Sequence, residues 1–313
     1  MTHFQGTLLI TAGVFLLLAG VTALGAWLKL VRAKGRPHPL IDNINLRIQA
    51  WWAMTVTIGF ALIAGRIGVV VLFAFVSFTA LREFLTIAPT RRSDHQALVM
   101  AFFVALPFQY FLVGVEWLGF QEVFIPVYAF LFLPILSAVK SDTRNFMERS
   151  GTIQWGLMVT VFCISHIPAL LSLRIPGYEH RNVFLIVFLV LIVQSGDILH
   201  HVYSRLFGKH QIAPQVSPNK TIEGFIGGIA ASVTLGALLS WMTPFTISEA
   251  AWVSLATSLM GFFGGLVLSA MKRDLGVKDW GANIEGGGML DRVASVCFAA
   301  PVFFHLVRHW WSV

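Results

Sequence analysis

The strongest constraint on this chain is its series of apolar segments, most of them long enough to cross a lipid bilayer. A membrane-spanning helix needs about 20 predominantly apolar residues. Hydrophobic residues make up 57% of the 313 and charged residues only 12%, whereas soluble domains are about 45–50% apolar and about 25% charged. We therefore predict an all-α, polytopic transmembrane helical bundle of about ten spans. The predicted spans are 7–28, 50–65, 67–82, 97–115, 122–139, 154–173, 183–203, 224–242, 251–270 and 290–307.

The basic residues give this bundle a predicted orientation. If the spans alternate and the N-terminus lies outside, 18 of the 22 Lys and Arg residues fall in loops on one side. Cytoplasmic loops carry such an excess, so we expect an integral protein of the inner or plasma membrane with both termini outside. The same bias accounts for the net charge of +7, and we predict no nucleic-acid partner.

The first of two polar segments on the predicted cytoplasmic side runs from Gln194 to Gly228. Its Asp197 lies within an apolar run, where an unpartnered carboxylate costs about 2.5–3.5 kcal/mol on insertion scales. Such a residue usually faces a polar cavity, and we interpret Asp197 in this way. The alternative is a structural partner for a basic residue on a neighbouring helix.

The loop after Asp197 combines lysines, hydroxyls and the predicted start of a helix. Lysines and free backbone N–H groups suit phosphate oxygens, and a helix N-terminus favours anions. The spacing of a Walker A loop is absent, and a basic loop that only anchors the orientation is the equal alternative. The candidate binding residues are Lys209, Ser217, Lys220, Thr221 and Glu223.

The second polar segment, from Ser269 to Ser295, mixes cations, acids and glycines. Mg²⁺ is held by one or two carboxylates plus substrate phosphate oxygens, and Lys and Arg neutralise charge on transferring phosphate groups. A solvated charged loop would explain the charges but not the four glycines, so we favour a Mg²⁺–polyphosphate site. The charged candidates are Lys272, Arg273, Lys278, Asp279, Glu285, Asp291 and Arg292, and the glycines are Gly281, Gly286, Gly287 and Gly288.

Together the two segments resemble the CDP-diacylglycerol synthase (phosphatidate cytidylyltransferase) family. The family signature reads roughly S-x-x-K-R-x4-K-D-x-G, then a glycine-rich stretch with H-G-G, then x-x-D-R-x-D. The upstream segment is also similar, with Asp197, LFGKH, AP-x-VSP-x-KT, and the pair Glu223 and Gly224. The positions that match in order are Ser269, Lys272, Arg273, Lys278, Asp279, Gly281, Gly287, Gly288, Asp291 and Arg292.

The sequence departs from the family pattern at two places. The stretch between the two halves of the signature reads ANIEGGGML, which lacks the family's His and is one residue shorter. The last Asp of D-R-x-D is replaced by Ala294. The resemblance therefore leaves Asp279 and Asp291 as the metal ligands, with Glu285 or Asp197 as substitutes.

The resemblance implies an enzyme that converts CTP and phosphatidate to CDP-diacylglycerol and pyrophosphate with Mg²⁺. It implies catalytic roles for Asp279, Asp291, Lys272 and Arg292. It also implies that Asp197, Lys209, Ser217, Lys220, Thr221, Glu223, Arg273, Lys278, Gly287 and Gly288 bind substrate.

This interpretation divides the chain into residues 1–150, N-terminal transmembrane helices, and 151–313, C-terminal helices that carry the nucleotide and metal site. Membrane lipids surround both parts, and a homodimer is one of the oligomeric states left open. Two other functions remain as alternatives. The first is a non-catalytic homologue that binds nucleotide or anionic lipid. The second is a transporter, which ten spans and Asp197 allow, although we find no internal repeat of the kind many transporters show.

Overall fold

The computed structural model describes residues 64–179, 181–281 and 288–313, together with isolated positions between 19 and 61. The chain divides into two compact units, Met1–Val69 and Val70–Val313. The second unit holds all the described candidate site residues. The division into residues 1–150 and 151–313 was based on where the nucleotide and metal site is expected, so it stays a prediction.

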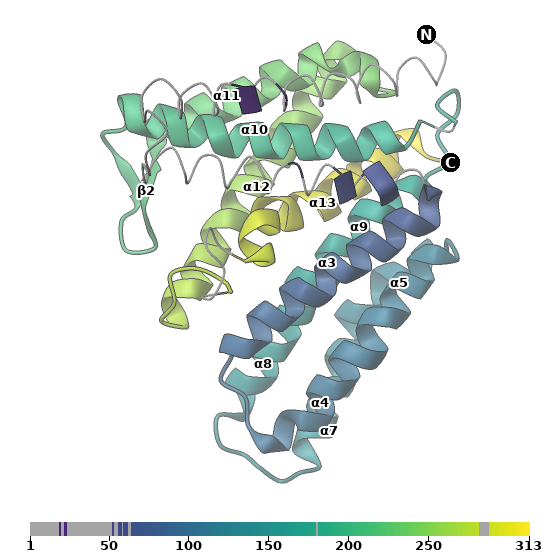
Figure 1. Ribbon diagram of the computed structural model, residues 1–313, viewed down its shortest axis with the longest axis vertical. Coiled ribbons are helices and arrows are strands. Elements are labelled where there is room, and N and C mark those ends of the chain that lie inside the picture. Colours follow the sequence, from purple (N-terminus) through teal and green to yellow (C-terminus); the bar gives the residue numbers. More distant parts are fainter. Residues whose placement is uncertain are drawn as a thin grey trace. The chain divides into compact units, whose positions relative to one another are not determined.

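The described part of the chain is mostly helical, and its two short strands form an antiparallel hairpin (Figure 1). Several of the long helices contain π-helical turns, labelled η together with the 3-10 turns. The elements in chain order are α3 (Gly65–Ile87), η1 (Arg92–Asp94), α4 (His95–Met100), η2 (Ala101–Ala105), α5 (Leu106–Gly114), α6 (Leu118–Val123), η3 (Phe124–Ala129), α7 (Phe130–Ala138), α8 (Phe146–Leu157), η4 (Met158–Cys163), α9 (Ile164–Ala169), η5 (Leu170–Ser172), α10 (Val183–Phe207), β1 (Gln211–Ala213), β2 (Ser217–Thr221), α11 (Ile222–Leu238), η6 (Ser240–Met242), α12 (Ile247–Asp274) and α13 (Met289–Trp311).

Seven helices among the described residues are long and apolar enough to cross a membrane. Helix α11 overlaps the predicted span 224–242, but its 17 residues extend only about 25 Å, less than the roughly 30 Å hydrocarbon core. The predicted spans 7–28 and 50–65 lie largely outside the described residues, so ten spans are not confirmed. The seven helices are Gly65–Ile87, Arg92–Gly114, Leu118–Ala138, Phe146–Ser172, Val183–Phe207, Ile247–Asp274 and Met289–Trp311.

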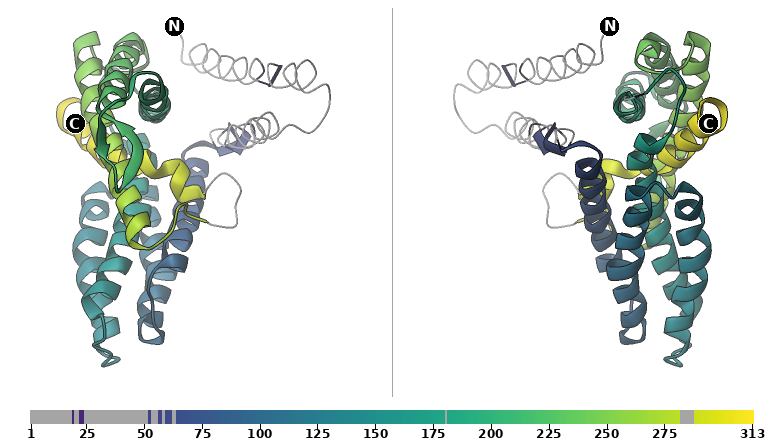
Figure 2. Two further views of the ribbon diagram at one scale, coloured as in Figure 1. Left: turned by 90° about the vertical axis from the view of Figure 1, so that its left-hand side faces the viewer. Right: turned by 90° about the vertical axis from the view of Figure 1, so that its right-hand side faces the viewer.

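Small residues allow the C-terminal helices to pack closely. Helices α10 and α11 run side by side (Figures 1 and 2), α12 packs against both, and α13 packs against α10 and α12. A Cβ atom at Gly228 would lie 2.9 Å from Cβ of His200 and 3.0 Å from the carbonyl oxygen of Gly196. The GxxxG spacing of Gly224 and Gly228 therefore serves close packing against α10, as the sequence predicted.

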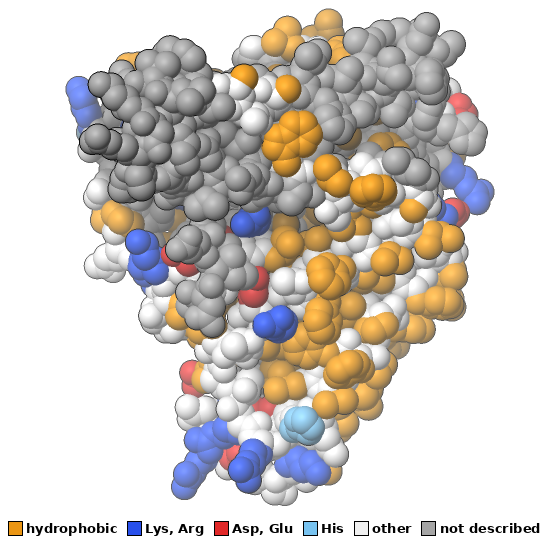
Figure 3. Space-filling view, viewed as in Figure 1, with side chains coloured by type: hydrophobic (Ala, Val, Ile, Leu, Met, Phe, Trp, Pro, Cys, Tyr) orange, Lys and Arg blue, Asp and Glu red, His pale blue; other side chains and the backbone are white. Residues whose placement is uncertain are grey.

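The helices α3 to α5 present a broad apolar surface (Figure 3). Its exposed side chains include Phe75 of α3, Phe103 of η2 and Phe111 of α5. Lys and Arg side chains gather at the end of these helices where the α3–η1 and α7–α8 connections lie (Figure 3). Such a surface fits a protein whose outer face contacts lipid, while the side of the membrane on which these cations lie stays a prediction.

Candidate functional site

A cleft of about 270 Å³ lies where α10, β2, α12 and α13 meet. It brings together side chains from both polar segments, although 40 residues (229–268) separate the two segments in the chain. Ala294, which replaces the family's last Asp, also lines this cleft. The predicted site residues in its wall are Asp197, Ser217, Lys220, Lys272 and Asp291.

One side of the cleft is formed by Asp197 and Lys220. The Asp197 carboxylate interacts with the side chain of Ser295 and with the charge of Lys220. The Lys220 ammonium donates to the carbonyl oxygen of Phe262 at 3.2 Å and lies 4.4 Å from the centre of the Phe262 ring. Burial, and then the nearby Lys272, lower the pKa of Lys220, while Asp197 opposes this shift. Lys220 is thus a partly desolvated cation whose charge a bound anion would stabilise.

The cleft also contains an ion pair between Lys272 and Asp291, with 2.8 Å between Nζ and Oδ1. The second carboxylate oxygen of Asp291 accepts the backbone N–H groups of Trp280, at 2.8 Å, and Gly288, at 3.3 Å. Asp291 therefore fixes the start of α13 and the chain around Trp280 while it faces the cleft. The side chains of Lys272 and Asp291 are only 18% and 19% exposed, so the ion pair is largely shielded from solvent.

Glu83 of α3 is a site-forming residue that the sequence analysis missed. Its carboxylate is buried and accepts the first two backbone N–H groups of α13, from Met289 at 2.8 Å and Leu290 at 2.9 Å. The adjacent Phe84 stacks on the buried Trp280 with 5.2 Å between ring centres. Glu83 supplies the capping that the N-cap residue Gly288 cannot give from a side chain. The one signal in the sequence was a carboxylate inside the apolar stretch ALREFLTI.

Glu223 and Thr221 hold the hairpin against the start of α11. Thr221 caps the helix, because its hydroxyl accepts the N–H of Gly224 at 3.1 Å. The Glu223 carboxylate accepts the backbone N–H groups of Lys209 and His210, and lies 2.6 Å from Nδ1 of His210. The His210 contact, followed by these backbone bonds, lowers the pKa of Glu223 to about 2. Both residues were predicted to bind substrate, and both have structural contacts here.

The remaining candidates of the second segment lie outside the cleft wall. Arg273 is exposed and donates to the carbonyl oxygen of Val216 at 3.3 Å, and the carbonyl oxygen of Arg292 accepts from Gln194 at 3.3 Å. Lys278 and Asp279 are exposed. Gly287, like Glu285, lies outside the described residues. No cluster of three His, Cys, Asp or Glu side chains suited to a metal occurs among the residues described, so the pairing of Asp279 with Asp291 on one ion stays a prediction.

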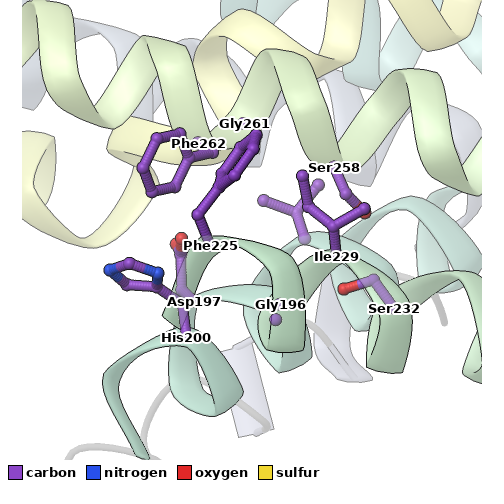
Figure 4. Close-up of a pocket in the computed structure, with 11 residues that line it drawn as sticks. Gly196, Asp197, His200, Phe225, Ile229, Ser232, Ser258, Gly261 and Phe262 are labelled. Atoms are coloured by element: carbon purple, nitrogen blue, oxygen red, sulfur yellow. The ribbon is translucent and has the colours of Figure 1, made fainter. Parts of the chain in front are cut away.

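Two further cavities adjoin the cleft. Figure 4 shows a small cavity of about 20 Å³ between α10, α11 and α12, with Asp197 and His200 on one side and Phe225 and Phe262 above them. It has room for about one water molecule. A larger pocket of about 370 Å³ lies between the end of α10 and the hairpin, and it shares His201 and Asn219 with the cleft. Lys209 and Thr221 line this hairpin pocket.

The apolar helices and the charged cleft between them define an integral membrane protein with a polar site at the junction of its C-terminal helices. The chain belongs to the cytidylyltransferase family, whose model matches residues 45–310. This match confirms the predicted family and extends it well beyond the C-terminal third of the chain, where the signature residues lie.

Individual relatives agree with this assignment. The chain is 34% identical over 272 residues to the uncharacterized protein YnbB of Escherichia coli (strain K12), which covers 85% of this chain and 88% of that protein. It is 33% identical over 196 residues to a phosphatidate cytidylyltransferase of Staphylococcus saprophyticus, covering 59% of this chain and 75% of that protein. The corresponding protein of Staphylococcus aureus (strain COL) is 32% identical over 195 residues, or 59% and 74% of the two chains.

Proposed function

We propose that this protein is a phosphatidate cytidylyltransferase, which transfers the cytidylyl group of CTP to phosphatidate and releases pyrophosphate. The observation that carries the proposal is the cleft, in which Asp197 and Lys220 of the first segment meet Lys272 and Asp291 of the second. Family membership and the names of the Staphylococcus relatives support a transferase of this class. CTP and a lipid phosphate are the partners that this proposal requires.

The chemistry needs positioning and charge stabilisation more than a strong base. A phosphatidate oxygen is already anionic near neutral pH, so catalysis consists largely of aligning it with the α-phosphorus of CTP. The bond from this oxygen to the α-phosphorus forms, and the bond from the α-phosphorus to the pyrophosphate oxygen breaks. Lys220 and Lys272, which both line the cleft, are suited to stabilise the charge on the phosphate oxygens.

The residues in the cleft fit the Mg²⁺ that the family implies. Two carboxylates, Asp197 and Asp291, line it, and Mg²⁺ takes one or two carboxylates together with substrate phosphate oxygens. Bound there, Mg²⁺ would neutralise phosphate charge and favour the departure of pyrophosphate. Each carboxylate has a lysine near it, Lys220 for Asp197 and Lys272 for Asp291. These lysines are the cations that a phosphate group would attract away from the carboxylates.

The position of the cleft suits a reaction at the membrane surface. The cleft lies where spans α10, α12 and α13 meet the hairpin, so a lipid headgroup and a soluble nucleotide could both reach it. We propose that this face is cytoplasmic, because CTP is a cytoplasmic metabolite and most of the basic residues fall on this side of the predicted topology.

A turnover assay tests the proposed function. Purified protein in mixed micelles of detergent and phosphatidate, supplied with CTP and Mg²⁺, should release pyrophosphate. Omission of phosphatidate, or replacement of CTP by ATP, gives the matched controls. If a known phosphatidate cytidylyltransferase turns over in the same micelles and this protein does not, the proposal is wrong.

A non-catalytic homologue is the second candidate, and Ala294 favours it. This residue lies in the cleft wall, at the position where the family pattern has a carboxylate. A paired experiment separates the two candidates: the wild-type chain is compared with Ala294→Asp, and with Ala294→Asp carrying a His inserted in the glycine stretch. An enzyme turns over without these changes, whereas a degenerate homologue gains turnover only with them.

A further inference from the structure

The hairpin pocket has a strongly cationic lining. Arg205, Lys209 and His201 contribute side chains to it, and no carboxylate is among the described residues that line it. Within the described part of the chain, Arg205 and Lys209 form no ion pair with an acid. The carboxylate of Glu223, at the start of α11, is bound to His210 and to two backbone N–H groups. Uncompensated cations around a pocket of about 370 Å³ favour an anionic group.

An apolar stripe lies next to this pocket on α10. Leu191, Ile198, Val202 and Leu206 are 38%, 57%, 41% and 68% exposed. Their spacing of seven, four and four residues places them on one face of a helix with 3.6 residues per turn. Because α10 is one of the candidate membrane spans, this exposed face is suited to contact acyl chains.

The order of side chains around α10 connects the stripe with the cleft. At 3.6 residues per turn, Arg205 follows the apolar stripe around the helix, His201 comes next, and Asp197 follows. His201 also lines both the hairpin pocket and the cleft, as does Asn219. A molecule with apolar chains along the stripe would thus carry its headgroup past Arg205 toward the cleft.

From these three observations we propose that the hairpin pocket binds the phosphate group of the lipid substrate, with Arg205 and Lys209 as its cationic partners and the α10 stripe along its acyl chains. The inference rests on the proposed function and deepens it, because it divides the substrates between two cavities. The cleft with Lys220 and Lys272 then receives the phosphates of the nucleotide. Arg205 was not a candidate from the sequence, where it counted only as a basic loop residue.

Surface-dilution kinetics test this division. The mole fraction of phosphatidate is varied at saturating CTP, and CTP is varied at saturating phosphatidate, for the wild type and Arg205→Gln. Because a charge-assisted hydrogen bond is lost, the KM for phosphatidate should rise at least about tenfold, with the KM for CTP unchanged. Arg205→Lys should recover much of the loss. The matched control is Arg92→Gln, which removes an exposed arginine of η1 and should change neither KM.

Lys209→Gln provides a second test if Arg205→Gln does not fold. It removes an exposed cation from the other wall of the pocket and should also raise the KM for phosphatidate alone. If both variants leave that KM unchanged, or raise the KM for CTP equally, the inference is overturned.

Direct lipid binding separates the failure of this inference from the failure of the proposed function. Native mass spectrometry of the protein in detergent compares bound phosphatidate, phosphatidylcholine and inorganic phosphate, for the wild type, Arg205→Gln and Leu206→Gln. We expect phosphatidate to bind best, and both variants to weaken it. If the protein shows no turnover but still binds phosphatidate in a way that depends on Arg205, the proposed activity is wrong and the proposed lipid-phosphate pocket is supported. If the protein turns over but its binding of phosphatidate does not depend on Arg205, the proposed activity is supported and the proposed pocket is wrong.

Discussion

The charge cluster around Arg149 of α8 and the α10–α13 cleft both contain buried charged side chains, but only those of the cleft line a cavity. Arg149 of α8 is 2% exposed and is enclosed by Asp94, with 3.1 Å between Nε and Oδ2, and Asp142, with 3.0 Å between Nη1 and Oδ2. Its Nη1 and Nη2 groups also donate to the backbone carbonyl oxygens of Arg144, at 2.7 Å, and Asp142, at 2.9 Å. No cavity is needed to explain this cluster, because its charges are balanced by the protein itself.

The cleft charges are also paired, but their pairs face open space. Lys272 and Asp291 are in contact while both line the cleft, and Asp197 lies near Lys220 in the same wall. A ligand can therefore replace a partner within each pair without moving the helices. A buried charge therefore indicates a binding site only when it also lines a cavity. Removal of a charge should cost stability at α8 and activity at the cleft.

The largest effect is expected for Asp291→Asn. The variant keeps the size of the side chain but removes the charge that pairs with Lys272, and turnover should fall about 100-fold or more, as for loss of a transition-state electrostatic contact. The thermal unfolding midpoint should change much less than the rate. Equal loss of folded protein and of activity would remove the distinction between the two regions.

The second effect concerns stability. Arg149→Met leaves the buried Asp94 without its partner, and breaking such a pair costs about 3–5 kcal/mol. The unfolding midpoint in detergent should drop strongly, and the remaining folded protein should keep its KM for CTP. The control is Arg144→Gln, an exposed arginine five residues earlier, which should leave stability unchanged. A stable Arg149→Met protein would contradict the account of this cluster.

A smaller effect is expected for Glu83, which connects α3 with the cleft through the start of α13. Glu83→Ala leaves two backbone N–H groups unpaired at about 1–3 kcal/mol each, while Glu83→Gln keeps one acceptor and should lose less. Because Glu83 acts through Asp291, we expect kcat to fall more than the KM for either substrate, and Glu83→Gln to recover part of kcat. Loss of stability with kcat unchanged would make Glu83 a purely structural residue.

The smallest effect is a pH dependence of the hairpin. The folded-state pKa of Glu223 lies near 2, below its ordinary value of 4.5. Its contribution is therefore present above pH 4.5 and is lost as the pH falls toward about 2. The protection of the backbone amides of residues 209–213, measured as exchange relative to the intrinsic rate at each pH, should fall over this range in the wild type, and Glu223→Gln should show low protection at all these pH values. An unchanged pH dependence in Glu223→Gln would assign the effect to another group.

Local features of the fold were predictable from the sequence because they depend on local physics. Apolar runs place seven spans close to their structural bounds, and Thr221 does begin a helix, since a hydroxyl there caps the N-terminus. The hairpin Gln211–Thr221 was missed, because its strands are short and contain Pro218. The convergence of Asp197, Lys220, Lys272 and Asp291 was also within reach, once both segments were assigned to one side.

Non-local contacts were out of reach. Glu83 meets Met289 across 206 residues, and no pattern in either segment indicates that pairing. Glu223 has a side chain of a type suited to binding, but its carboxylate already contacts His210 and accepts a backbone N–H group. The sequence identifies which residue types suit phosphate, while the packing decides which of them remain available to it.

We propose that the two polar segments form one cleft that transfers a cytidylyl group to a lipid phosphate. Transfer of label from CTP carrying ³²P in its α-phosphate to the lipid fraction, in phosphatidate micelles with Mg²⁺, measures this step directly. We predict that label enters the lipid in equal amounts with released pyrophosphate, and that Lys220→Gln and Asp291→Asn, one from each segment, both suppress it. Release of pyrophosphate without labelled lipid, or labelling that survives both substitutions, would contradict the claim.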